Sequence, residues 1–580
     1  MSSRAATQRH ALELYELKKK AVKFYQKNNV PEKIEEILNS LFYQNPEDVY
    51  GSLAEYFSRL SNPASVSRIT ALEILDCKGQ PTIEVDVYCI RNGTEKFVCT
   101  CKISSFSVLP DGVSMEKKDM EERERSEGIA AAIALIDHDI IEMLKGVNPC
   151  NQFDVDTKLR ELASKLLEEY EKKLAIHKED DGSELTVAAA AKEIPAKDGK
   201  VSSAKNKKKM GSAKSGVVVI VEPREMMLPG CDAFGASSQV VARASAIIKD
   251  QPLYQYISHL YSNQEDVIEY RMPIPLVTVL CSGKSALGKQ NLIKEVLLVP
   301  KPGQTFQKAL KNVSAVYHQI RKMLFAKYGA SCNNVNDVGG FCPVMDKTEM
   351  LLDVVVEAID QQQLNEQVNI MIDCAAHEIF DHEKCKYEIL TSMLKTSDDL
   401  IDVYVDFIAR YPAIVGIIDP LRKQDVDAWQ KLIEKISDKC FVIGDYIYPR
   451  AERLVTEGNG GLRSSAAVLK LQQQTTITDI INATKQIKET NGECIISGVR
   501  GDTEEDFIAD LAVGIGAKFV KFGGILRGER TSKYNRLLKI EQELRSKCLA
   551  IPYDSLDIPN ILPPPAQEDD ANTLAPDAVS

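Results

Sequence analysis

Several features that would assign a function directly are absent from the sequence. No apolar run approaches the roughly 20 residues of a membrane span, and we find no signal peptide, so we expect neither membrane insertion nor secretion. The fourteen cysteines contain no CxxC pair and the seven histidines no HExxH motif, which argues against zinc ribbons and zinc hydrolases. A reducing, cytoplasmic setting fits this cysteine usage. The net charge of −12 argues against nonspecific nucleic-acid binding.

The composition predicts a large globular chain of several parts. With 580 residues and 44% apolar content, it can bury more than one core. Residues 177–216 are rich in Lys, Ala and Ser without an apolar period, which predicts a disordered insertion, and 549–580, with PPP and an acidic run, predict a disordered tail. We therefore expect a helical extension at 1–62, an α+β domain at 67–270 and a barrel domain at 271–548.

The C-terminal third repeats one pattern, in which a short apolar strand ends beside a polar residue. Residues 503–515 have an apolar helical face and precede a strand, 518–522, that carries Lys521. Strands recur about every 25 residues, the spacing of a (β/α)8 barrel. They end near Asp419, Asp445, Lys470 and Gly498. The fold class predicted is α/β.

In a barrel of this kind active sites lie at the carboxyl ends of the strands. Lys470, Lys521 and Asp445 should then converge on one pocket. The alternative is that each charged residue merely caps its strand. Two apolar strands that both carry a lysine at this position favour the pocket.

Residues 67–88 predict an antiparallel hairpin, with a turn at KGQP and an alternating strand at Ile83, Val85 and Val87. Its sequence, ILDCKGQPTIEVDV, resembles the opening hairpin of the enolases. Further blocks resemble the family in its own order: KYGASCNNVNDVGG, NIMIDCA, IIDPLRKQDVDAW, LKLQQQTTITDII and GDTEEDFIADLAVG. The resemblance runs with interruptions from about residue 67 to 544. It implies an enolase barrel preceded by an α+β domain, and a homodimer.

The resemblance also implies a site. Enolases dehydrate 2-phosphoglycerate: a lysine removes the proton next to the carboxylate and Mg²⁺ stabilises the enediolate. By motif, Lys470 falls on the catalytic base and Lys521 on the second lysine, which contacts substrate. Asp373 and Asp445 fall on two of three metal ligands, and Glu295 on a glutamate that assists the leaving group.

Other family positions are changed. Ile418 stands in place of the third metal ligand, and the neighbouring Asp419 is expected on the other side of the strand, so Mg²⁺ binding should be weakened. Val338 replaces the acidic leaving-group glutamate. The family's histidine and phosphate-binding arginine near 497–500 are missing, although Arg500 could reach the same anion. Ser107 is what remains of the loop that closes over the metal.

These losses predict an enolase fold with weak or absent turnover of 2-phosphoglycerate or a related small anion. The alternative is a noncatalytic structural or docking component. A further possibility, a different carboxylate or phosphate ligand, is kept open by Arg500.

The docking alternative is based on the N-terminal helices. Helices are predicted within residues 8–60, one beginning at Pro31 and one near Pro46. Residues 31–57 resemble the dimerisation and docking helix pair of the type II regulatory subunit of protein kinase A. That resemblance implies self-association and an amphipathic-helix scaffold partner bound through residues 31–60, often in cilia or flagella. An equally open reading is a helical extension packed on its own barrel.

Overall fold

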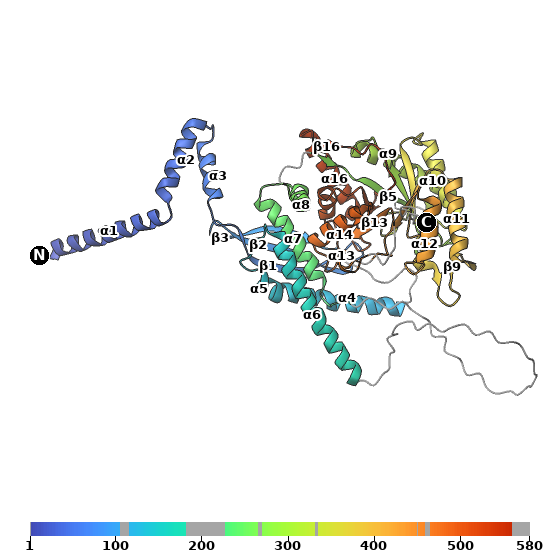
Figure 1. The fold of residues 1–580 in the computed structure, drawn as a ribbon, viewed down its shortest axis with the longest axis horizontal. Coiled ribbons are helices and arrows are strands. Elements are labelled where there is room, and N and C mark those ends of the chain that lie inside the picture. Colours follow the sequence, from blue (N-terminus) through green and yellow to red (C-terminus); the bar gives the residue numbers. More distant parts are fainter. Residues whose placement is uncertain are drawn as a thin grey trace, which may run out of the picture. The chain divides into compact units, whose positions relative to one another are not determined.

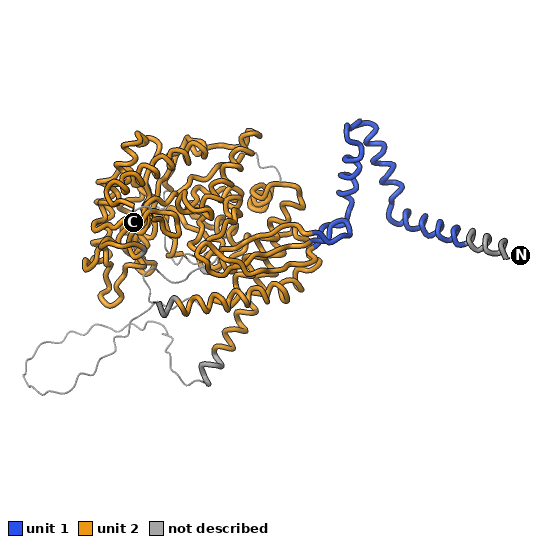
Figure 2. Tube along the Cα trace, turned by 180° about the vertical axis from the view of Figure 1, so that it is seen from behind, with its two compact units in different colours: residues 1–65, 89–96 blue, residues 66–88, 97–580 orange. Residues whose placement is uncertain are grey.

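A computed structural model describes residues 2–104, 115–180, 227–264, 269–330, 334–448, 450–458 and 464–559. Ser107 and most of the predicted insertion lie outside these ranges. The chain divides into two compact units, one of Met1–Ser65 with Cys89–Lys96 and one of Val66–Tyr88 with Phe97–Ser580 (Figure 2). None of the helices in the described ranges combines the length and apolarity needed to cross a membrane.

The first unit contains three helices, α1 (Ser2–Lys27), α2 (Val30–Gln44) and α3 (Val49–Arg59). Pro31 lies in the first turn of α2, where its missing N–H costs no hydrogen bond. The third helix begins beyond Pro46 because Asp48 caps it, accepting a hydrogen bond of 2.8 Å from the Gly51 N–H. Ile37 and Leu41 are buried. The large apolar side chains left exposed on α2 and α3 are Ile34, Leu38, Phe42, Tyr43, Val49, Tyr50 and Phe57.

The predicted hairpin is present. It joins β1 (Ser65–Leu75) and β2 (Pro81–Arg91), and β3 (Thr94–Lys102) completes a sheet in the order β1-β2-β3. Its turn is closed by Asp76, whose Oδ1 accepts the N–H groups of Lys78 and Gln80, both at 2.8 Å. Helices follow it along the chain (Figure 1). They are α4 (Met115–Leu135), continued by a π-helical turn (Ile136–Ile140) and α5 (Ile141–Leu144), then α6 (Gln152–Asp180), α7 (Asp232–Ile248) and α8 (Leu253–Ser262).

The second half forms a closed barrel in the order β11-β12-β13-β14-β15-β5-β6-β7, which confirms the predicted α/β barrel. The strands are β5 (Ile274–Cys281), β6 (Glu295–Pro300), β7 (Val368–Asp373), β11 (Ile414–Ile418), β12 (Phe441–Gly444), β13 (Ala466–Lys470), β14 (Glu493–Ser497) and β15 (Phe519–Gly523).

One strand departs from the uniform repeat. β6 is antiparallel to both of its neighbours, β5 and β7, whereas the other barrel pairs are parallel. A short connection, residues 282–294, replaces the helical crossover that a parallel pair needs. Two consecutive helices, α9 (Phe306–Tyr328) and α10 (Thr348–Gln361), then separate β6 from β7.

The remaining helices follow the later strands and cover the barrel (Figure 1). They are α11 (Ser397–Arg410), α12 (Val426–Ile436), α13 (Ala451–Glu457), α14 (Ile477–Glu489), α15 (Phe507–Gly514) and α16 (Gly528–Ser546). A 3₁₀ turn (Gly283–Ser285) precedes β6, and another (Ala376–Ile379) follows β7 and leads into a small sheet of β8 (Phe380–Asp381), β9 (Lys386–Leu390) and β10 (Met393–Lys395). A two-stranded pair joins β4 (Tyr270–Arg271) to β16 (Ala550–Ile551).

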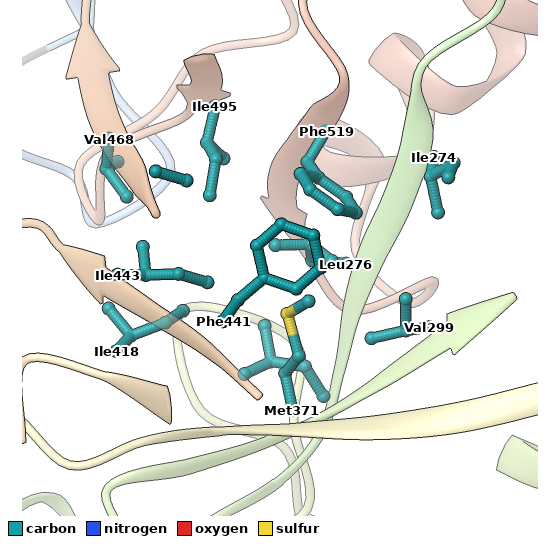
Figure 3. Close-up of a cluster of buried hydrophobic side chains, with 12 residues drawn as sticks. Ile274, Leu276, Val299, Met371, Ile418, Phe441, Ile443, Val468, Ile495 and Phe519 are labelled. Carbon is teal, nitrogen blue, oxygen red and sulfur yellow. The ribbon is translucent and has the colours of Figure 1, made fainter. Parts of the chain in front are cut away.

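The barrel interior is filled by apolar side chains rather than open (Figure 3). Phe441 and Phe519 pack edge to face, with ring centroids 5.4 Å apart. Residues 560–580 of the predicted tail lie outside the described ranges, whereas residues 549–559 are described. Tyr553, Leu556 and Ile558 are partly buried and pack against this core.

Candidate active site

Two lysines stand level with each other at one end of the barrel. Lys470 ends β13 and Lys521 lies in β15, and the register places Ser497 of β14 between them, opposite both. Residues opposite one another in neighbouring strands point to the same side of the sheet. The two lysines therefore lie on one side of the barrel wall, at the carboxyl ends of their strands.

Each lysine forms an ion pair with a carboxylate that the sequence assigned to the metal. Lys470 Nζ lies 2.5 Å from Asp445 Oδ1, and Lys521 Nζ lies 2.6 Å from Asp373 Oδ2. Lys521 Nζ is also 3.7 Å from Glu295 Oε2. The structure thus brings together the five residues that the sequence placed in the pocket.

Glu295 reaches this group through the reversed strand. It is the first residue of β6, and because β6 runs antiparallel to β7, Glu295 lies opposite Asp373. Its Oε2 accepts a hydrogen bond of 2.9 Å from the hydroxyl of Thr278 on β5. A parallel β6 would have placed this carboxylate at the opposite end of the barrel.

Burial and charge set the protonation of the central pair. Burial by itself lowers the pKa of Lys521, but the nearby carboxylates of Asp373 and Glu295 raise it above the ordinary value of 10.5. Burial likewise raises the pKa of Asp373, yet the ammonium groups of Lys521 and Lys294 bring it below 3.8. Both groups are therefore charged at neutral pH.

The position of Asp419 differs from the sequence expectation. Ile418, in the place of the third metal ligand, is fully buried in the barrel core. Asp419 follows the end of β11 with a left-handed backbone (φ 45°), so strand alternation no longer fixes its direction. Its carboxylate accepts the N–H groups of Asp445 and Tyr446 at 2.8 and 2.7 Å. Burial, with Asp445 and Asp373 nearby, raises the pKa of Asp419 to about 7.

The fit of these residues to Mg²⁺ is partial. Among the described residues, no group of three His, Cys, Asp or Glu side chains is arranged to hold a metal ion. Mg²⁺ is nevertheless often held by one or two carboxylates together with water and substrate oxygens. Asp373 and Asp445 satisfy that requirement once they separate from their lysines. The third position, Ile418, offers no ligand atom.

The loop that should carry the acidic glutamate lies against the end of β15. The Val338 carbonyl accepts a hydrogen bond of 2.7 Å from Gly524 N–H, and a Cβ on Gly523 would lie only 2.5 Å from that carbonyl. The loop is held close by this glycine pair. Val338 itself is buried and has no proton to donate.

The charge of Arg500 acts on Asp337, in the loop that carries Val338. Burial raises the pKa of Asp337, but the charges of Lys78 and Arg500 hold it below the ordinary value, and Lys78 Nζ lies 3.2 Å from Asp337 Oδ2. The fully buried Arg530 donates to the carbonyls of Asp337 and Arg500. The predicted anion-binding role of Arg500 thus competes with its attraction to Asp337.

Sequence reasoning missed several residues near these lysines and carboxylates. Lys294 forms an ion pair with Glu378, and the His377 ring stacks on Tyr446 with centroids 3.9 Å apart. Burial, with Lys294 nearby, lowers the pKa of His377 to about 3, so the ring is neutral at physiological pH. A signal was present: His377 and Glu378 follow Asp373 closely, in the loop after a barrel strand.

Comparisons with known proteins agree with this architecture. A family model described as "Enolase, N-terminal domain" matches residues 66–166, and one described as "Enolase, C-terminal TIM barrel domain" matches residues 269–554. Enolase 4 of Xenopus laevis is 38% identical over 541 residues, covering 92% of this chain and 93% of the relative. Enolase 4 of Homo sapiens is 32% identical, covering 92% and 89%. Enolase B of Dictyostelium discoideum is 31% identical, covering 83% and 95%. With these matches and this barrel, the chain belongs to the enolase family.

Proposed function

We propose that the pocket binds 2-phosphoglycerate, or a small anion like it, and dehydrates it weakly. The observation that carries this proposal is the group of Lys470, Lys521, Asp445, Asp373 and Glu295, all at one end of the barrel. The two ammonium groups can form charge-assisted hydrogen bonds with a substrate that carries both a carboxylate and a phosphate group. The carboxylates face them from β6, β7 and the end of β12.

In this proposal Lys470 is the base that removes the proton next to the substrate carboxylate. A lysine acts as a base only when uncharged, so its 2.5 Å ion pair with Asp445 must break first. Lys521 stays charged, because Asp373 and Glu295 hold its proton, and it stabilises negative charge on the substrate. Asp373 and Asp445 are the residues that would hold Mg²⁺, which would supply further positive charge to the substrate.

We expect weak turnover because the second step, the loss of the substrate hydroxyl, lacks a proton donor. The hydroxyl needs a proton to leave, and Val338 has none to give. Glu295 remains, but its carboxylate already faces the Lys521 ammonium at 3.7 Å and accepts the Thr278 hydroxyl, so it is not free to serve the leaving group. Loss of a general acid costs a factor of about 10² to 10⁴ in rate.

The test is a direct absorbance assay for phosphoenolpyruvate on the purified full chain with Mg²⁺. We expect a slow signal that Lys470→Ala removes. Lys431→Ala is the matched control, because Lys431 pairs with Asp398 at the surface. A wild-type signal no greater than that of Lys470→Ala would refute the proposed activity.

A second candidate is a docking role for the helix pair, which one observation favours. Seven large apolar side chains of α2 and α3 are exposed, although helices of this size normally bury their apolar faces. In this reading the pair self-associates and receives an amphipathic helix of a scaffold protein, as in a ciliary or flagellar assembly. Removal of residues 1–62 should abolish incorporation into that assembly. Full incorporation of the truncated chain would count against the docking role.

We also infer a homodimer, as is common among enolases. Light scattering of the full chain and of the chain without residues 1–62 separates the two contacts. A dimer that survives the truncation points to the enolase body, and a monomer points to the helices.

A further inference from the structure

Two cysteines on neighbouring chain segments lie beside the proposed pocket. Cys281 ends β5, and Cys342 follows the loop that carries Val338. Leu280 and Phe341 form a parallel bridge, with Cys281 N–H donating to Phe341 O at 2.8 Å and Phe341 N–H to Val279 O at 3.0 Å. Cys281 and Cys342 are the next residues on each side, so they stand opposite one another.

The Cα atoms of Cys281 and Cys342 are close enough for a disulfide bond. Neighbouring strands lie about 4.8 Å apart, within the Cα separation of about 4.4–6.8 Å that disulfides span. Both sulfurs lie against Gly340. Cys342 Sγ is 3.7 Å from the Gly340 carbonyl oxygen, and Cys281 Sγ is 2.5 Å from where a Cβ on Gly340 would be. A side chain there would push Cys281 away, so the glycine keeps the path between the sulfurs short.

The two thiols differ in a way that suits stepwise oxidation. Cys281 is buried and next to Glu295, and burial raises the pKa of its thiol. Cys342 is half-buried, and the neighbouring Cys281 thiol lowers its pKa below 9.0. The thiolate is the species that attacks peroxide, so Cys342 is the first to react.

We propose that Cys281 and Cys342 are a reversible disulfide pair that responds to hydrogen peroxide and fixes the Val338 loop to β5. The Cys342 thiolate attacks a peroxide oxygen; an S–O bond forms, the O–O bond breaks and hydroxide leaves. The Cys281 sulfur then attacks Cys342 Sγ, forming the S–S bond and releasing water as the S–O bond breaks. Two thiols are oxidised, and one peroxide becomes two waters after the hydroxide takes up the Cys342 proton.

The disulfide would restrain the Val338 loop, which lies beside the candidate site. The loop already contacts the end of β15 through Gly524 N–H and the Val338 carbonyl. A covalent link to β5 restrains its other side, next to Glu295. This inference does not depend on turnover, because it concerns the thiols and not the substrate.

The experiment treats the reduced full chain with hydrogen peroxide, blocks remaining thiols by alkylation and maps disulfides by mass spectrometry after digestion. We expect a linked peptide pair containing residues 281 and 342, two hydrogens lighter than the reduced pair and reversed by dithiothreitol. Cys281→Ser, Cys281→Ala and Cys342→Ser each remove it. Cys385→Ser and Cys548→Ser, at the exposed cysteines, leave it unchanged.

A melting measurement provides a second readout. Peroxide should raise the melting temperature of the wild type but not of Cys342→Ser, since a cross-link restricts the unfolded chain. Oxidation of Cys342 to its sulfinic acid with no 281–342 peptide would overturn the proposal. So would peroxide products confined to Cys385 and Cys548.

Discussion

Lys521 of β15 and Asp373 of β7 are joined across the barrel end, with Nζ and Oδ2 2.6 Å apart, although β5 and β6 separate their strands in the sheet. Both side chains are buried, so each charge is compensated mainly by the other. The contact ties the last strand of the barrel to the strand that carries the proposed metal ligand.

Lys521→Met should therefore destabilise the protein by about 3–5 kcal/mol, because it leaves Asp373 and Glu295 as buried charges without their partner. Chemical denaturation of variant and wild type at pH 7 measures the loss. Lys431→Met, at an exposed ion pair, is the control and should change stability by less than about 1 kcal/mol. Equal effects of the two substitutions would contradict the importance of the buried pair.

The stability difference between wild type and Lys521→Met should depend on pH. The pKa of Asp373 is lowered in the folded wild type, so its ion pair stabilises the fold above about pH 3.8 and loses that effect as the pH falls through the folded pKa. Without Lys521, burial should raise the pKa of Asp373. The stability difference between wild type and Lys521→Met should then shrink as the pH is lowered from 7 toward 4.5. A difference that grows on acidification would contradict this.

Ile418→Glu tests the missing metal ligand. The substitution places a carboxylate among apolar side chains, so it should destabilise the metal-free protein, whereas Ile418→Met should cost less than about 1.5 kcal/mol. Asp373 and Asp445 would then share a site with a third carboxylate, so millimolar Mg²⁺ should raise the melting temperature of Ile418→Glu more than that of the wild type. An equal Mg²⁺ response in both would show that Asp419 or water already completes the site.

His377 should not titrate near neutrality. Its pKa of about 3 lies below the ordinary 6.5, so the folded state binds fewer protons than the unfolded state and stability falls as the pH drops from 6.5 toward 3. NMR should show one imidazole, assigned by its absence in His377→Gln, unchanged between pH 5 and 8. The variant should also lose less stability than wild type on acidification over that window. A midpoint above pH 5 for this ring would refute the prediction.

Arg530 is expected to hold two loops together, residues 337–340 and residues 499–502. It donates to the carbonyls of Asp337, Val499 and Arg500 and pairs with Asp502 at 3.1 Å while fully buried. Arg530→Lys keeps the charge but loses the planar fork of donors, so we expect a loss of at least about 3 kcal/mol. Hydrogen exchange should rise around residues 499–502 and 337–340. Arg410→Lys, at the half-exposed pair with Asp406, should have almost no effect.

Local pattern was enough to predict much of the barrel. β13 and β14 carry unbroken apolar runs that end in a polar residue, so their positions and the side on which Lys470 emerges follow from strand geometry. The direction of β6 does not follow from its sequence, because EVLLVP reads equally well in either orientation. Only the short connection between β5 and β6 distinguishes an antiparallel from a parallel β6. That segment has no clear helical period.

The candidate site was harder to predict where the backbone leaves regular structure. Asp419 could not be placed from strand alternation, because its left-handed conformation turns the side chain toward the Asp445 and Tyr446 amides. His377 and Lys294 gave weak signals, since a single histidine or lysine beside a strand is most often a surface residue. Their proximity to Asp373 depends on contacts between segments far apart in the chain.

The closure of the barrel has a consequence for its synthesis. Ile274 of β5 pairs with Phe519 of β15, and Lys518 donates to the carbonyl of Asp557, where Leu556 and Ile558 cover the core. A nascent chain on the ribosome therefore holds an open sheet with an uncovered β5 edge until nearly all of the barrel has been translated. During translation this protein should depend on chaperones until residue 558 has emerged.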